Sequence, residues 1–440
     1  MLLSLLRYPM GEIGAEVRLF MASFVMRFGG AGAGAVQLTV LELAERLRMP
    51  PRVVMQAVSK LSTAEAYLVV KKVSVGRGRP SRSFEVSPSI LAILGEYPGV
   101  SCPPVCEQII KNLLSIQGEG GEEQNSDGCR SNAIGFKRPP VREKNNLPSV
   151  SNRWLLAVLV SHADGLGVVR GLGMSTLRQL TGMGEARLKS QLRRLVELGL
   201  IRSYVPGVSS AVFTDAKVSS IYFLNLNHPF LGLQSDGCAV LVLHGLGVNR
   251  REAVCAIAHP VVEHYFQQLK AEVFNLLYLR LDGYVSFLLT SHWSGLRRPV
   301  CPDLTQALQN MVSSDFQRPD GNSAGGMKIS KSNWAVVIEH FCWWVLERAK
   351  GIKGLLVRMP SGVSCGAPIA LIPAPDQADD TKVTTLLMEH APVPGVSCLV
   401  INYISPRVCE LHGRESELTT EDRYRFGLLT RPKASGGGDF

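Results

Sequence analysis

The spacing of apolar residues predicts a run of short amphipathic helices in the N-terminal part of the chain. Apolar residues recur every three or four positions from Glu12 to Phe28, which is the spacing of one helix face. A second helix is expected after Thr39, which can cap it in a reciprocal pair with Glu42 three residues later. The apolar stripe of this second helix consists of Val40, Leu43, Ala44 and Leu47.

A third helix is predicted directly after the second. A tight turn is expected at Arg48–Pro50, and Pro51 suits the first position of a helix. The inward stripe of this helix is Val54, Val58 and Leu61. Its other face presents Arg52, Gln56, Ser59 and Lys60. Two short helices joined by a tight turn are typical of the helix-turn-helix, whose second helix enters the major groove of DNA.

A basic strand pair is predicted next. Residues 68–75 and 83–86 read as two strands, and the glycines between them permit a tight turn. Five basic residues and no acidic residue fall between Lys71 and Arg82, namely Lys71, Lys72, Arg77, Arg79 and Arg82. An arginine–glycine–arginine tip is narrow enough to enter a minor groove, whose negative potential attracts arginine.

A similar order of elements is predicted between residues 152 and 234. Helices are expected at residues 154–161, 176–181 and 185–198, with Ser175 capping the second and Gly199 ending the third. The exposed stripe of the third helix and its flank carry Arg187, Lys189, Gln191 and Arg194. Strands at 200–205 and 220–224 are expected to follow. The loop between them has Lys217 but no arginine tip, so it suits a protein contact as well as a groove.

Both segments resemble the winged helix-turn-helix domains of bacterial transcription regulators. The resemblance rests on residues 38–86 and, in the second segment, on residues 187–201. The tip Gly76–Pro80 also resembles the core of an AT-hook, a minor-groove motif. The family implies a recognition helix in the major groove and a wing on the flanking backbone or minor groove. Residues 64–67 depart from the family pattern. In the family a glycine turn often ends the recognition helix at this point, whereas this sequence has Ala-Glu-Ala-Tyr.

The expected fold is mainly α with small β-hairpin wings, in two winged-helix domains followed by an α+β region. Residues 116–151 are rich in Gly, Glu, Asn, Ser, Lys and Pro, which predicts a flexible linker. The expected division is a first domain with a helical tail at 1–115, the linker, a second domain at 152–234, an α+β region at 235–432 and a disordered tail at 433–440.

The α+β region has fewer recognisable features. A long helix is expected from Asn249, which forms a capping box with Glu252. An aromatic helix is expected at Asn333–Lys350, and it is the candidate surface for homo-oligomer formation. Short strands are predicted at 368–372 and 398–404.

The charge balance favours an anionic partner. The formal net charge is +10 and the isoelectric point is near 9.2, which fits nucleic acid first, an anionic membrane surface second, and a merely solvated basic surface third. No apolar run is long enough to cross a bilayer, since Arg280 and Asp282 interrupt the best one at Leu276–Thr290. The N-terminus lacks the features of a signal peptide. The ten cysteines include no Cys-x-x-Cys pair, which suggests reduced thiols. We therefore expect a cytoplasmic, nucleoid-associated protein with no membrane partner.

Signals for catalysis or metal binding are weak. His259 and His264 flank a glutamate, but their spacing matches neither zinc-protease order. Asp376, Asp379 and Asp380 form a Pro-bounded acidic loop, which reads as a solvated loop. No phosphate-binding glycine loop followed by Lys-Ser/Thr occurs in the sequence. We therefore expect no cofactor, no metal and no enzyme activity.

Double-stranded DNA is the expected partner, and three roles remain open. Lys71, Lys72 and Arg82 suit phosphates. Residues placed to read base edges are Arg52, Gln56, Arg187 and Gln191. The leading role is transcription regulation. The alternatives are a replication or partition initiator of a mobile element, and a DNA-directed enzyme with an unrecognised active site in residues 235–432.

Overall fold

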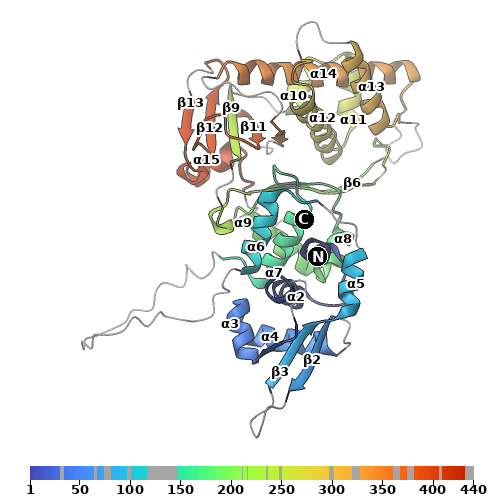
Figure 1. Cartoon of the computed structure of the whole chain (residues 1–440). Helices are drawn as coiled ribbons and strands as arrows, with labels where there is room; N and C mark the ends of the chain where they lie inside the picture. The colour runs from blue at the N-terminus through green and yellow to red at the C-terminus, as the bar shows by residue number, and fades with distance from the viewer. Residues whose placement is uncertain are drawn as a thin grey trace, which may run out of the picture. The chain divides into compact units, whose positions relative to one another are not determined.

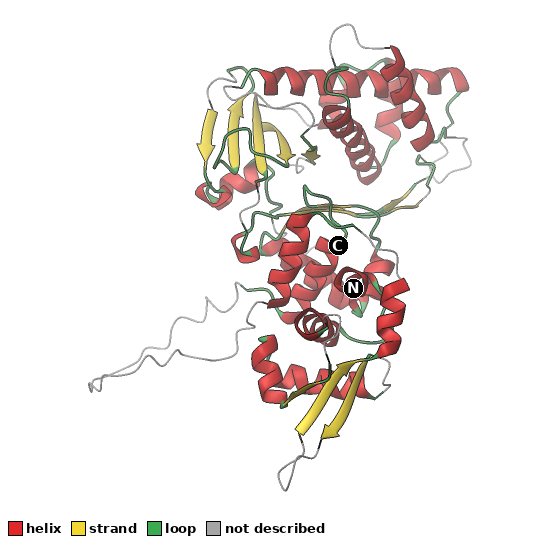
Figure 2. Ribbon diagram, in the orientation of Figure 1, coloured by secondary structure: helices red, strands yellow, loops and turns green. Residues whose placement is uncertain are grey.

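The computed structural model is a mixed α/β protein in which helices predominate and the sheets are small (Figures 1 and 2). The structure describes residues 1–29, 34–63, 67–73, 81–96, 101–115, 147–210, 212–215, 217–233, 236–246, 250–296, 302–319, 328–359, 367–373, 381–405 and 409–431. These residues form two compact units. The first consists of Met1–His162 with Met174–Leu198, and the second of Ala163–Gly173 with Gly199–Phe440.

The first unit is mostly helical. Its helices are α1 (Leu2–Arg7), α2 (Ala15–Phe28), α3 (Val40–Leu47), α4 (Pro51–Ser62), α5 (Pro88–Glu96), α6 (Pro104–Ser115), α7 (Val150–Ser161), α8 (Met174–Thr181) and α9 (Glu185–Glu197). Its strands are β1 (Val36–Leu38), β2 (Leu68–Val73) and β3 (Ser81–Val86), which form an antiparallel sheet in the order β1-β3-β2.

Several local predictions for this unit are confirmed. Thr39 caps α3 as expected, because its hydroxyl accepts a hydrogen bond from the Glu42 amide at 3.2 Å and Glu42 accepts one from the Thr39 amide at 2.7 Å. Pro51 occupies the start of α4. The predicted cap at Ser175 is wrong, since α8 begins at Met174 and Ser175 lies inside its first turn.

Two central helices, α2 and α7, organise the first unit. Helix α2 packs against α3, α4, α6 and α7, and α7 also packs against α8 and α9. Every residue of α7 from Ser151 to Ser161 is buried. A helix that is buried on all sides is a core helix, because it has no face left for water. Both predicted helix-turn-helix pairs, α3–α4 and α8–α9, are therefore attached to one shared core.

Two buried arginines join the helices of this core. The Arg18 side chain of α2 has no exposed surface, and it donates to the carbonyl oxygens of Gln179 at 2.8 Å and Leu180 at 2.7 Å in the last turn of α8. Arg153 of α7 donates two hydrogen bonds to the Leu113 carbonyl of α6, at 3.0 and 2.6 Å. Burial lowers the pKa of each guanidinium to about 10. These cations satisfy carbonyl groups that a helix leaves without partners at its C-terminus.

The second unit combines a five-stranded sheet with a helical layer. Its sheet has the order β10-β11-β9-β12-β13, with β9 (Cys238–Leu246), β10 (Ile369–Ile372), β11 (Thr381–Met388), β12 (Cys398–Asn402) and β13 (Cys409–His412). Strands β9 and β12 are parallel and the other neighbours are antiparallel. Its helices are α10 (Arg250–Cys255), α11 (Pro260–Gln268), α12 (Ala271–Ser291), α13 (Pro302–Asp315), α14 (Lys331–Val357) and α15 (Thr420–Arg425), with short 3-10 turns at Pro229–Leu231 and Glu415–Glu417.

Small strands complete this unit. They are β4 (Val168–Val169), β5 (Ile201–Val205) and β8 (Ile221–Leu224) in the order β4-β8-β5, and the pair β6 (Val208–Ser209) and β7 (Lys217–Val218). The long helix expected from Asn249 is instead two short helices, α10 and α11, because Pro260 starts a new helix that His259 caps. Asn249 itself lies outside the described residues. The aromatic helix is confirmed as α14 and is longer than predicted.

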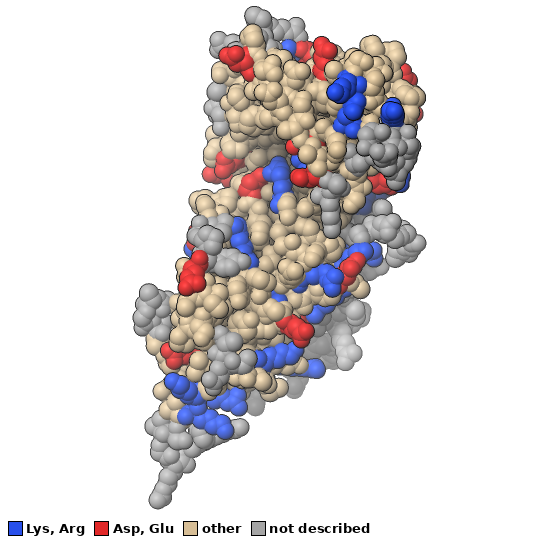
Figure 3. Space-filling view, turned by 90° about the vertical axis from the view of Figure 1, so that its right-hand side faces the viewer, with Lys and Arg blue, Asp and Glu red and all other residues tan. Residues whose placement is uncertain are grey.

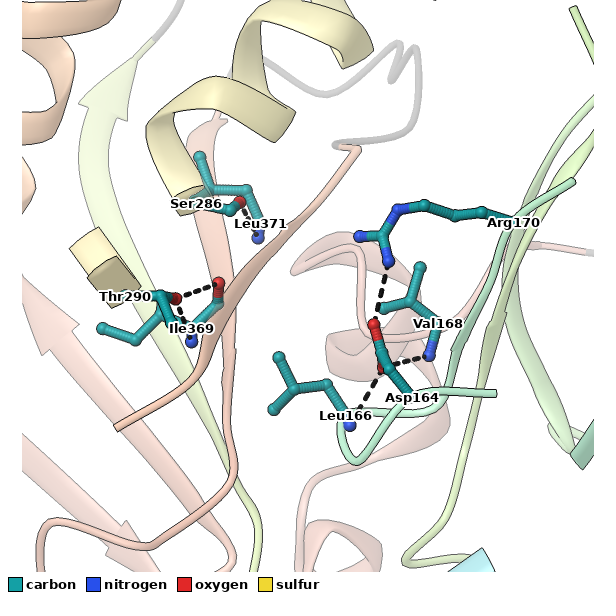
Figure 4. Close-up of polar contacts among 8 residues, drawn as sticks. All are labelled: Asp164, Leu166, Val168, Arg170, Ser286, Thr290, Ile369 and Leu371. Carbon is teal, nitrogen blue, oxygen red and sulfur yellow. Dashed lines mark hydrogen bonds and ion pairs between the residues drawn. The ribbon is translucent and has the colours of Figure 1, made fainter. Parts of the chain in front are cut away.

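Polar side chains fasten the edge of the large sheet to α12. Figure 4 shows Ser286 and Thr290 of α12 beside β10. The Ser286 hydroxyl accepts from the Leu371 amide at 3.1 Å, and the Thr290 hydroxyl accepts from the Ile369 amide at 3.0 Å. The helix therefore occupies backbone groups of an edge strand, which protects that strand from pairing with another chain.

Gly182 is the position where the first unit has least room for a side chain. It has a φ of +66°, and a Cβ placed on it would stand 1.9 Å from the Ile13 carbonyl oxygen and 2.9 Å from the Arg18 Nε. Replacing Gly182 with alanine is therefore expected to lower the free energy of unfolding by more than about 1 kcal/mol, because both the backbone angle and the contact are unfavourable. Urea denaturation measures the change.

The control for this substitution is Gly95→Ala in α5. Gly95 has open space around its Cα and an ordinary helical backbone. Alanine is expected to be neutral or slightly stabilising there. Equal stability of the two variants would contradict the tight packing of Gly182 against Ile13.

Candidate nucleic-acid interface

Helix α4 presents a continuous polar face to solvent. Its buried side is Val54, Ala57, Val58 and Leu61, which pack toward α2, α3 and β2. The four predicted side chains on the opposite side, Arg52, Gln56, Ser59 and Lys60, are all exposed. They lie at helical spacing, so one face of α4 carries two cations and two neutral hydrogen-bonding groups.

The hairpin of β2 and β3 holds like charges side by side. Lys72 lies directly opposite Arg82 in the antiparallel register, and Lys71 lies opposite Ser83. Lys71, Lys72 and Arg82 are exposed. None of them forms an ion pair with another residue in the described part of the chain. Opposed like charges on one face of a hairpin repel each other, and a bound anion relieves that repulsion.

The basic side chains gather at one end of the first unit. Figure 3 shows Lys and Arg side chains clustered at the level at which Figure 1 places β2, β3 and α4. The predicted tip residues Arg77 and Arg79 lie outside the described residues. The strands on either side of them are confirmed as β2 and β3.

The two α9 residues that were predicted to contact base edges, Arg187 and Gln191, instead bind other residues of the first unit. Arg187 forms an ion pair with Glu16 of α2 and donates to the Ser151 hydroxyl at 2.6 Å. Burial favours a raised pKa for the Glu16 carboxyl, but its hydrogen bonds with Arg187 and Ser151 hold the pKa below the usual range. The Gln191 side chain accepts a hydrogen bond from Ser149 at 3.3 Å.

The other two cations of α9 pair along their own helix. Lys189 lies 3.3 Å from Glu185, and Arg194 lies 3.1 Å from Glu197. Sequence reasoning missed the role of Glu16, because it lies 171 positions from Arg187 and no local pattern joins them. The exposed face of α9 is thus more neutral than that of α4.

Two residues in the loop of the second predicted wing are buried within the second unit. Val212 and Phe213 lie between β6 and β7 and are almost fully buried, Phe213 with 1% of its surface exposed. The Val212 carbonyl accepts from the Gln317 amide at 2.8 Å, and the rings of Phe213 and Phe316 are 5.6 Å apart. This loop therefore packs at the end of α13.

Strand β5 is also fixed to the C-terminal part of the chain. Arg202 forms a buried, two-pronged ion pair with Glu415, one arm of which measures 2.7 Å. The Arg202 carbonyl accepts from the Thr430 amide at 2.7 Å. Bidentate pairs of this kind hold two segments in one orientation. Strand β5 is thus held to the C-terminal part of the second unit.

The remaining candidate sites have structural roles where the structure describes them. The His259 ring caps α11 by accepting from the Val261 amide, and His264 contacts Gln268. No cluster of three metal-ligating side chains occurs among the described residues. The acidic loop with Asp376, Asp379 and Asp380 lies outside them. No helix in the described ranges has the length and apolarity needed to cross a membrane.

The aromatic residues of α14 mostly build the core. The Phe341 ring stacks 5.9 Å from Phe266, and Trp344 is buried against Tyr278. Trp343 remains substantially exposed on the other side of the helix. Trp343 and Val357 are the large apolar side chains that this helix exposes.

Comparison with family models, with curated proteins and with solved structures gave no match for this chain.

Phe213→Ala tests the structural role of the loop between β6 and β7. Removing a buried ring that packs against Phe316 is expected to lower the free energy of unfolding by about 3–5 kcal/mol. Phe287→Ala is the matched control, since Phe287 of α12 has 39% of its surface exposed and should cost less. Thermal and urea unfolding measure both. A loss for Phe213→Ala no larger than the control would mean that the loop is not part of the core.

Proposed function

We propose that this chain binds double-stranded DNA through α4 and the β2–β3 hairpin. The observation that carries the proposal is the pairing of an exposed polar face on α4 with the unneutralised Lys72–Arg82 pair on the hairpin beside it. Neutral hydrogen-bonding groups flanked by cations suit a surface that contacts both bases and phosphates.

The order of elements supports a winged-helix reading of this region. The sequence α2, β1, α3, α4, β2, β3 with sheet order β1-β3-β2 is typical of a winged helix. The sequence α7, β4, α8, α9, β5, β8 with sheet order β4-β8-β5 repeats it. The same order of elements thus occurs twice along the chain. In the second occurrence α7, α8 and α9 belong to the first unit and β4, β5 and β8 to the second, and only the first occurrence has an exposed basic hairpin among the described residues.

Each exposed group has a distinct role in the proposed complex. Lys71, Lys72 and Arg82 bind phosphates and release counterions, which makes affinity depend on salt. Arg52 and Gln56 reach base edges in the major groove, where arginine pairs with guanine and glutamine with adenine. Arg77 and Arg79 enter the adjacent minor groove.

We infer that the biological role is transcription regulation. Because Val212 and Phe213 of the second wing loop are buried and α9 is engaged in internal ion pairs, α4 is the better candidate for the DNA-reading helix. One DNA-reading helix per chain suits a single operator that is bound by one copy of the chain or by two copies related by symmetry.

The hairpin cations are expected to control affinity and its salt dependence. Replacing Lys71, Lys72 and Arg82 with alanine should weaken binding and reduce the slope of log K against log salt by roughly 2–3, because each phosphate contact contributes nearly one. Gel-shift titration at several salt concentrations measures both quantities. Lys111→Ala is the control, since Lys111 pairs with Glu107 on α6. An affinity and slope equal to those of the control would exclude the hairpin from DNA contact.

The arrangement of bound sites separates regulation from replication initiation. Selection from a random DNA pool gives the preferred sequence, and footprinting on DNA that contains it gives the number of copies occupied. A regulator is expected to protect one site or one inverted pair. An array of repeats that fills together would contradict regulation and favour an initiator.

A further inference from the structure

One large apolar side chain is exposed on helix α4. Met55 has 58% of its surface exposed, whereas Val54, Ala57, Val58 and Leu61 of the same helix are buried. Exposing an apolar side chain to water carries a free-energy cost. Neither the packing of the first unit nor the polar contacts proposed above give Met55 a role.

Met55 belongs to the same face as the predicted DNA-reading residues. It lies three positions after Arg52 and four positions before Ser59. Residues at these separations lie along one stripe of an α-helix, and Gln56 borders this stripe. All of them are exposed. The sequence spacing alone allows this placement, but an apolar residue is normally assigned to the core and so escapes a search for base contacts.

The position of Met55 along α4 also favours base contact. Helix α4 begins at Pro51, so Met55 lies between the first and second turns. Residues near the N-terminus of a recognition helix are the ones that contact base edges. In the proposed complex, the cations of neighbouring β2 and β3 bind phosphates while α4 contacts the bases.

The major groove offers an apolar side chain one natural partner. Among the base edges there, the C5-methyl group of thymine is the apolar one, and the others are hydrogen-bond donors and acceptors. A methionine side chain is flexible and adapts its shape to such a group. We propose that Met55 determines specificity by contacting a thymine methyl group beside the bases read by Arg52 and Gln56. This inference rests on the proposed DNA-binding function.

Uracil substitution isolates the methyl contact. The preferred duplex is first selected from a random pool by the full-length chain. Each thymine in it is then replaced in turn by uracil, which pairs in the same way but lacks the methyl group. The full-length chain is expected to lose about fourfold in affinity at one such position, the factor expected for one buried methyl group. Met55→Ala is expected to bind the thymine and uracil duplexes equally at that position.

An exposed apolar residue on another helix provides the matched control. Leu41 of α3 has 69% of its surface exposed and is not part of the α4 stripe. Leu41→Ala should keep the full loss on uracil substitution. Thermal unfolding checks that both variants remain folded, as expected for changes at exposed positions.

The outcomes separate this inference from the proposed function. If the full-length chain selects no DNA, the proposed function fails and the role of Met55 fails with it. If the chain binds DNA but no uracil position weakens binding, or Met55→Ala keeps the same loss, DNA binding stands and the methyl contact is overturned. A change in self-association by Met55→Ala with an unchanged uracil profile also overturns it, because Met55 would then contact a second copy of the chain.

Discussion

The placement of the helix pairs α3–α4 and α8–α9 depends on a guanidinium group that is withdrawn from water. Arg18 projects from α2, the helix against which α3 and α4 pack, and its donors end on the last turn of α8. A buried cation is costly unless its hydrogen bonds are satisfied, so its partners cannot move away without a large penalty. The turn at Gly182 has no room for a side chain, because Arg18 and the Ile13 carbonyl group to which it donates occupy the space. One side chain thus couples the geometry of two modules that lie far apart in sequence.

The contrast between the two strand sets follows from their chemistry. The first hairpin carries lysine and arginine, which lose hydration free energy when buried, so it remains at the surface. The second loop carries Val212 and Phe213, which gain free energy by leaving water. The same order of elements therefore gives an exposed basic hairpin at β2 and β3, but a loop with buried apolar residues between β6 and β7. The difference between the two arises from the side chains of the hairpin and of the loop more than from the helices that precede them.

Local signals in the sequence were the most informative about structure. Thr39 with Glu42, Pro51 and Gly199 each mark a helix end through backbone chemistry that needs no distant partner, and Gly199 has the expected positive φ of 72°. The error at Ser175 arose because the helix starts one residue before the residue chosen as its cap.

Long-range contacts were beyond the reach of the sequence pattern. Helical periodicity indicated that Arg187 lies on a polar face, but it could not show that Glu16 of another helix covers that face. The same limit hid the ion pair between Arg202 and Glu415. Met55 is the opposite case, since its spacing from Arg52 and Ser59 can be read from the sequence, but an apolar side chain gives no sequence signal for a base contact.

The shared core also determines how the helices on either side of residues 116–149 are held. Helices α6 and α7 pack directly against each other, although residues 116–149 separate them along the chain. Both ends of that interval are held by the surrounding helices, and Arg153 bonds one end to the other. The entropy lost on closing a loop grows only with the logarithm of its length. The direct packing of α6 on α7, and not the length of chain between them, therefore sets how these two helices lie against each other.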